Sequence, residues 1–138
     1  MGRILAVDYG QKRIGLAVTD ELKIAAHALD TILVKDIHDY IRNYVKQNDV
    51  ETIVVGLPIT LDNQASESTP FVDNFVNWLS NEFPQIPVKR IDERFTSKMA
   101  FQTMIDSGIS KKARKDKSLI DRISATIILQ SFLDSVNY

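Results

Sequence analysis

The feature that most constrains the fold is a continuous apolar run, TIVVGL, at residues 52–57. A strand with apolar side chains on both faces is typical of a sheet that other elements cover on both sides. Helical patterns precede and follow this run, at 37–48 and 71–79. Because strand–helix–strand units favour parallel pairing through right-handed crossovers, the run predicts an α/β fold.

Local patterns predict the other elements. Further strands are expected at 3–8, at 13–19 after a turn at 9–12, within 24–34, and at about 88–91. Helices are expected at 37–48 with Asp36 as N-cap, after the pair Thr69–Pro70, at 96–107 before Gly108, and at 118–135. The order β-β-β-α-β-α-β-α-α predicts a mixed five-stranded sheet with helices on both faces, extended by an antiparallel first hairpin.

Length and composition narrow the class of protein. A chain of 138 residues with 44% hydrophobic and 25% charged residues predicts one globular domain over residues 1–138. Because the sequence has no cysteine, it excludes disulfides, thiolate nucleophiles and cysteine-ligated zinc. The apolar runs are too short for a membrane span, and Asp8 comes too early for a signal peptide, so we expect a cytoplasmic protein without membrane contact.

Acidic residues follow two of the expected strands. Asp8 follows the first strand, and Asp92–Glu93 follows the last. Functional groups in such sheets gather beyond the carboxyl ends of the parallel strands, so these acids are expected at one edge. Asp121 begins the final helix on the same stripe as Ala125 and Ile128, which predicts a carboxylate that faces the sheet.

Three converging carboxylates would suit a hard divalent cation, Mg²⁺ or Mn²⁺, because these ions prefer oxygen ligands. Such ions can activate water and stabilise the transition state of phosphodiester hydrolysis. Each acid also has a structural alternative. Asp8 could shape a turn, Asp121 could complete a capping box with Ser118, and Glu93 could pair with Arg94 or Lys98 on the surface.

Basic residues lie next to each of these acids in the sequence, although the formal net charge is only −1. A solvated loop is the alternative interpretation of the most basic segment, KKARKDK at 111–117. If these residues bind phosphates, binding should be sensitive to salt. The residues predicted to contact nucleic acid are Lys12, Arg13, Arg94, Lys98, Lys111, Lys112, Arg114 and Lys115.

Four ordered blocks together resemble one bacterial family: DYGQKRIGLA at 8–17, VGLP at 55–58, DERFT at 92–96 and DRISA at 121–125. This is the family of Holliday-junction-resolvase-like proteins, also described as pre-16S rRNA nucleases, of the ribonuclease-H-like superfamily. The resemblance implies strand order 3-2-1-4-5 and a metal-dependent nuclease that matures the 5′ end of pre-16S rRNA. It also implies that the catalytic, metal-binding acids are Asp8, Glu93 and Asp121.

One departure from the wider superfamily concerns Gly56. The second acid often stands on the fourth strand, where this chain has Gly56, and Glu93 follows the fifth strand instead. Since neighbouring strands lie about 4.8 Å apart, Glu93 would have to reach across one strand to meet Asp8. We therefore expect that Gly56, which has no side chain, leaves that space open.

The sequence also leaves other functions open. The same fold could cut branched DNA as a Holliday-junction resolvase, or bind nucleic acid without turnover. An actin-like ATPase is disfavoured by length and by the lack of a phosphate-binding loop. The expected partner is pre-16S rRNA, with the ribosomal particles that contain it, or branched DNA. The oligomeric state can be either monomer or homodimer. His27 and His38 are expected to have no catalytic role, and Trp78 is expected to pack in the core.

Overall fold

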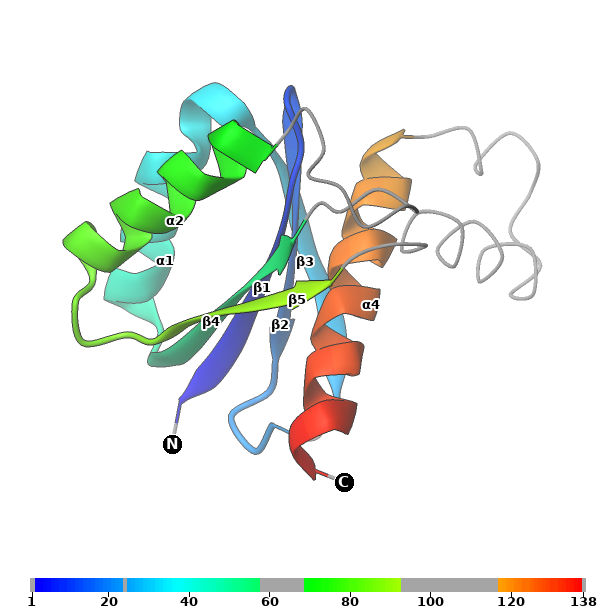
Figure 1. Ribbon diagram of the computed structural model, residues 1–138. Helices are drawn as coiled ribbons and strands as arrows, with labels where there is room; N and C mark the ends of the chain where they lie inside the picture. The colour runs from blue at the N-terminus through cyan, green and yellow to red at the C-terminus, as the bar shows by residue number, and fades with distance from the viewer. Residues whose placement is uncertain (1, 24, 58–68, 93–116, 138) are drawn as a thin grey trace.

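The computed structural model describes residues 2–23, 25–57, 69–92 and 117–137 (Figure 1). Five strands form one sheet in the order β3-β2-β1-β4-β5, which confirms the predicted topology. The strands are β1 (Arg3–Tyr9), β2 (Arg13–Thr19), β3 (Ala26–Leu33), β4 (Val50–Leu57) and β5 (Val88–Asp92). The helices are the short 3₁₀ helix η1 (Val34–Asp36), α1 (Ile37–Gln47), α2 (Thr69–Glu82) and α4 (Lys117–Asn137).

The sheet is mixed, as the connection lengths predict. The hairpin strand β2 is antiparallel to both β1 and β3, whereas β1, β4 and β5 are parallel. Val7 pairs with Val55, and Gly56 pairs with Ile91. The carboxyl ends of the three parallel strands therefore meet at one edge of the sheet, and β2 begins at that same edge.

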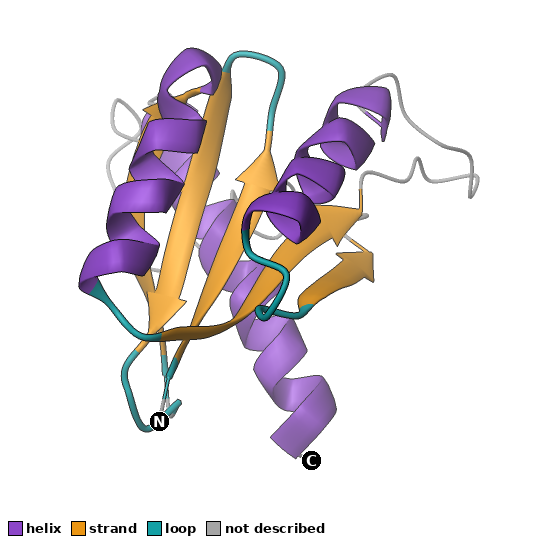
Figure 2. Cartoon of the chain, turned by 90° about the vertical axis from the view of Figure 1, so that its left-hand side faces the viewer, coloured by secondary structure: helices purple, strands orange, loops and turns teal. Residues whose placement is uncertain are grey.

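Helices cover both faces of the sheet (Figures 1 and 2). Helices α1 and α2 lie on one face, in the foreground of Figure 2, and α4 crosses the opposite face. α1 buries Ile37 and Ile41, one turn apart, and α2 buries residues at helical spacing. These side chains pack with alternate residues of β1, β2 and β4, such as Leu5, Leu16 and Ile53.

Small residues line the sheet beneath α4. Ala6 of β1 and Ala17 of β2 pair across the hairpin, and both pack in the cluster that α4 covers. The helix contributes a stripe of apolar residues to this cluster: Ala125, Ile128, Leu129 and Leu133. Because the strand side chains here are short, the helix backbone can approach the sheet closely at its first turns.

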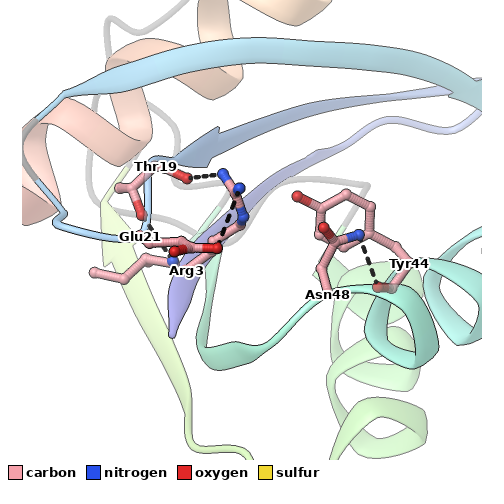
Figure 3. A network of polar contacts seen from close by, with 6 residues as sticks. Arg3, Thr19, Glu21, Tyr44 and Asn48 are labelled. Atoms are coloured by element: carbon pink, nitrogen blue, oxygen red, sulfur yellow. Dashed lines mark hydrogen bonds and ion pairs between the residues drawn. The ribbon is translucent and has the colours of Figure 1, made fainter. Parts of the chain in front are cut away.

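Polar contacts secure the strand ends at the opposite edge of the sheet (Figure 3). The Arg3 guanidinium donates a hydrogen bond to the Thr19 carbonyl at 3.1 Å and lies 3.8 Å from the Glu21 carboxylate. The hydroxyl of buried Thr19 accepts a 2.9 Å bond from the Ile4 backbone N–H. The start of β1 is therefore fixed to the end of β2.

The structure refines some predicted boundaries. β1 continues through Tyr9, which the sequence pattern places in the turn, because Tyr9 pairs with Ile14. Asp36 occupies the predicted N-cap position of α1, but its carboxylate makes no capping hydrogen bond since its backbone is helical. The helix predicted at 96–107 lies outside the described residues. Of the helices that are described, none is both long and apolar enough to span a membrane.

Candidate active site

Asp8 lies near the carboxyl end of β1 and faces α4. Side chains alternate between the two faces of a strand, and Ile4 and Ala6 belong to the α4-side cluster. Asp8 continues this series and is partly buried. It pairs across the hairpin with Gly15. Asp8 is therefore part of the strand ladder, and the tight turn after it is closed by the Gly10 N–H, which donates to the Arg13 carbonyl at 3.0 Å.

Gly15 brings α4 against the sheet at Asp121. A Cβ atom placed on Gly15 would overlap the Asp121 carbonyl oxygen and lie only 2.5 Å from its carbonyl carbon. Real Cβ atoms essentially never approach other atoms within 3.0 Å, so only glycine allows this contact. Since Asp8 is the cross-strand partner of Gly15 on the same face, this contact places the first turns of α4 beside Asp8.

The Asp121 carboxylate points back to the sheet, as predicted from its helical stripe. Its Oδ2 atom accepts a hydrogen bond from Arg13 Nε at 3.0 Å, although the residues are 108 positions apart in sequence. The two side chains are 24% and 32% exposed, so water only partly screens the pair. Asp121 therefore makes a tertiary ion pair, which the capping-box alternative does not explain.

Gly56 occupies the same level of the neighbouring strand β4. Val55 pairs with Val7, so Gly56 follows Val55 as Asp8 follows Val7. Gly56 is buried and pairs on its other side with Ile91 of β5. Because Val54 packs in the α4-side cluster, Gly56 faces that same side. Between Asp8 and the end of β5, the strand thus contributes no side chain.

Several predicted site residues lie outside the described residues. These are Glu93, Arg94, Lys98, Lys111, Lys112, Arg114 and Lys115. Glu93 comes directly after Asp92, the last residue of β5. Lys12 is described, and it lies exposed in the turn between β1 and β2. Asp8, Asp121, Arg13 and Lys12 are therefore the predicted site residues that the structure brings to one edge.

The donor atoms at this edge fit a hard divalent cation. Two carboxylates share one face of the sheet, and carboxylate oxygens are the ligands that Mg²⁺ and Mn²⁺ prefer. Two such anions at one end of a sheet repel each other unless cations compensate them, and Arg13 compensates part of the charge of Asp121. Within the described ranges, no group of three His, Asp or Glu side chains is placed to hold a metal ion, and Glu93, the third predicted ligand, lies outside these ranges.

Comparison with known proteins decides the family. A sequence model of the RuvX family, described as Holliday junction resolvase, matches residues 2–135. The chain belongs to the RuvX family. A Flavobacterium johnsoniae protein named "Putative pre-16S rRNA nuclease" is 52% identical over 138 residues, the whole of both chains. A Bacteroides fragilis protein of the same name is 48% identical over 135 residues, 98% of each chain.

Solved structures show the fold of this RuvX-family chain. Fowlpox virus resolvase, determined with Holliday junction DNA, superposes with a TM-score of 0.59 at 13% identity and covers 99% of both chains. Thermus thermophilus RuvC, determined with its Holliday junction substrate, gives a TM-score of 0.57 at 16% identity over 98% of this chain and 96% of RuvC. At these identities the likeness concerns the fold alone, which is ribonuclease-H-like as predicted.

Aromatic residues near this edge serve packing in the RuvX-family chain. The rings of Tyr9 and Phe75 lie 4.9 Å apart between centroids, and burial raises the pKa of Tyr9 above its ordinary value. His38 stacks on Trp78 at 4.0 Å, on the α1–α2 side of the sheet and so on the other face from Asp8. His27 is exposed on β3. The predicted packing role of Trp78 is confirmed.

Two features of the site are not among those predicted from the sequence. Gly15 is treated as an ordinary strand residue, although an isolated glycine inside a strand often marks a place where another backbone segment approaches closely. Arg13 is expected as positive charge beside Asp8, its neighbour in sequence, and its contact with Asp121 is not foreseen. The first feature has a sequence signal, whereas the second depends on how closely α4 meets the sheet.

Proposed function

We propose that this chain is a divalent-metal-dependent nuclease that hydrolyses phosphodiester bonds and processes the 5′ end of pre-16S rRNA. The observation that carries the proposal is the juxtaposition of Asp8 and Asp121 on one face of a ribonuclease-H-like sheet, through the contact at Gly15. The names of relatives about half identical over the full chain support the RNA substrate.

In this proposal Asp8, Glu93 and Asp121 hold Mg²⁺ or Mn²⁺. Asp8 comes from β1 and Asp121 from α4, while Glu93 directly follows β5. Gly56 on the strand between them adds no side chain that would block Glu93. A bound ion supplies Lewis-acid activation of water and of the phosphate, so no lysine or histidine is needed as a base.

The chain's own residues then position the substrate. Arg13 at the start of β2 contacts Asp121, and Lys12 precedes it in the exposed turn, so both can contact phosphate oxygens near the carboxylates. The carboxylates lie on the face that α4 covers, so the proposed substrate path is on that side of the sheet, away from α1 and α2. The further cations in this role are Arg94, Lys98, Lys111, Lys112, Arg114 and Lys115.

The setting follows from the same proposal. A nuclease of rRNA precursors acts in the cytoplasm on ribosomal particles, as one domain spanning residues 1–138. The second candidate, cleavage of four-way DNA junctions, is favoured by the description of the family model. That activity requires paired nicks on two strands, and thus a homodimer, whereas the RNA reaction can be carried out by a monomer. Analytical ultracentrifugation in the presence of each substrate distinguishes the monomer from the homodimer.

Cleavage assays test the proposal. Asp8→Asn and Asp121→Asn each delete one charge and nearly preserve shape, so we expect cleavage of a pre-rRNA 5′ segment in Mn²⁺ to fall at least about a hundredfold. Asp134→Asn is the matched control, because Asp134 is exposed on the same helix and bonds Gln130. Wild-type rates in Asp8→Asn would refute the catalytic assignment, and preferred cleavage of a four-way DNA junction would favour the second candidate.

A further inference from the structure

The ion pair between Arg13 and Asp121 places a positive charge where the proposed metal ion would bind. Arg13 Nε lies 3.0 Å from Asp121 Oδ2, so the guanidinium directly contacts one of the proposed ligand atoms. Both side chains are more than two-thirds shielded from water. A charged pair so placed is worth more than an exposed surface pair, and it occupies an oxygen that a metal would need.

The fold makes this contact a consequence of close packing. Arg13, Gly15 and Ala17 alternate along β2 and therefore share the face that α4 covers. The contact at Gly15 brings the Asp121 backbone onto the strand. Arg13, at the start of β2, then reaches the carboxylate from the side of the exposed turn residues Gln11 and Lys12.

The electrostatic effect of Arg13 reverses when a divalent ion binds. Without an ion, the guanidinium compensates part of the negative charge that Asp8 and Asp121 bring together. With an ion on Asp121, two cations would share one carboxylate and repel each other. The side chain of Arg13 is 32% exposed, so it has a way out toward solvent. Once turned toward solvent, the planar guanidinium can donate two hydrogen bonds to the oxygens of a phosphate group.

We propose that Arg13 is an exchangeable counter-ion of the metal site: it holds Asp121 until a divalent ion displaces it, and it then binds a phosphate oxygen of the nucleic acid strand. This inference rests on the proposed function, because it takes Asp121 as a metal ligand. It makes Arg13 a positioning residue that weakens metal binding by free protein and couples ion binding to substrate binding.

Calorimetric titration of the nucleic-acid-free protein with Mn²⁺ tests the inference without any activity measurement. An ion that binds Asp121 must first break the hydrogen bond from Arg13, and a hydrogen bond between charged groups is worth roughly a tenfold change in an equilibrium constant. Arg13→Gln removes this competition, so it should lower the Kd for Mn²⁺ about tenfold. The same variant should unfold at a lower temperature than wild type in EDTA, since Asp121 loses its ion pair with Arg13. Unchanged or weaker Mn²⁺ binding would overturn the inference.

Two matched variants separate the effect of the ion pair from a change in overall charge or a loss of folding. Arg122→Gln removes the same charge from the position next to Asp121 on α4, and its effect on the Kd should stay below about threefold because consecutive side chains of a helix do not face each other. Arg13→Lys keeps the charge but shortens the reach, so it should tighten Mn²⁺ binding by a smaller factor than Arg13→Gln. If Arg13→Gln does not fold, Arg13→Lys decides the question, and wild-type affinity in that variant would overturn the inference.

The failure of this inference can be told from failure of the proposed function. If Asp8→Asn and Asp121→Asn bind Mn²⁺ as wild type does, the metal site itself is wrong. If both weaken Mn²⁺ binding while Arg13→Gln does not tighten it, only the exchange by Arg13 is wrong. Binding of a single-stranded RNA in the presence of Ca²⁺ tests whether the displaced Arg13 contacts phosphate. Arg13→Gln should weaken RNA binding several-fold more than Arg122→Gln does.

Discussion

Replacing Gly15 by alanine tests whether the approach of α4 to the sheet creates the site. The added Cβ would lie 2.5 Å from the Asp121 carbonyl carbon and 3.2 Å from its Cα, where 3.4–4 Å is ordinary contact. Strand and helix must therefore separate by about 1 Å to regain normal packing. Overpacking of this kind costs about 1–3 kcal/mol of unfolding free energy.

The same displacement should also lower the rate of cleavage. Because Asp121 moves away from Asp8 while both side chains remain, the carboxylates no longer fit one ion, and a misplacement of about 1 Å can lower a rate about a hundredfold. The assay is single-turnover cleavage of a pre-rRNA 5′ segment in Mn²⁺, at a temperature where circular dichroism shows the variant folded. Urea unfolding of the same sample gives its stability.

The control is Leu133→Ala, which changes the same helix at its far end. Leu133 is buried in the α4-side cluster, and its truncation should cost about 2–5 kcal/mol without moving Asp121. We expect Leu133→Ala to be the less stable protein and to cleave at the wild-type rate when folded. If Gly15→Ala retains wild-type cleavage and stability, the reasoning about the close approach is wrong.

Two further predictions concern other parts of the sheet. Gly56→Val should impair metal-dependent cleavage while the fold survives, because a branched side chain would fill the space between Asp8 and β5; unchanged activity would refute this hypothesis. The hydrogen bond from Lys23 lowers the pKa of Glu51, so this carboxylate stabilises the folded state above its unfolded pKa and ceases to do so as the pH falls through its folded pKa. Glu51→Gln should therefore reduce the loss of unfolding free energy at acid pH, as measured by urea unfolding at several pH values. The effect should be small because the ion pair with Lys23 is partly exposed, and an unchanged dependence on pH would contradict this role of Glu51.

The sequence is sufficient to predict the sheet because its signals are local. The alternation in 13–19 and the apolar run at 52–57 identify β2 and β4, and short connections indicate the antiparallel hairpin. The predicted end of β1 comes too early, since the turn residues that follow it mask the pairing of Tyr9 with Ile14. Strand order comes from resemblance to the family and agrees with the structure.

The site is predictable in part, for a physical reason. The position of Asp8 at a strand end and of Asp121 on an apolar stripe both follow from periodicity, and both face the interlayer space in the structure. The pairing of Arg13 with Asp121 does not follow, because it depends on the distance between helix and sheet. That distance is short because Gly15 has no side chain and because Ala6 and Ala17 have only small ones. The periodicity of the sequence does not predict it.

The most direct test of a shared metal site is anomalous diffraction from crystals of the protein grown with Mn²⁺. We expect a manganese peak within about 2.0–2.4 Å of carboxylate oxygens from both Asp8 and Asp121, with Glu93 as a further ligand. Arg13 should then have left Asp121 Oδ2. A manganese peak only elsewhere on the protein, with no ion shared by Asp8 and Asp121, would contradict the proposed site.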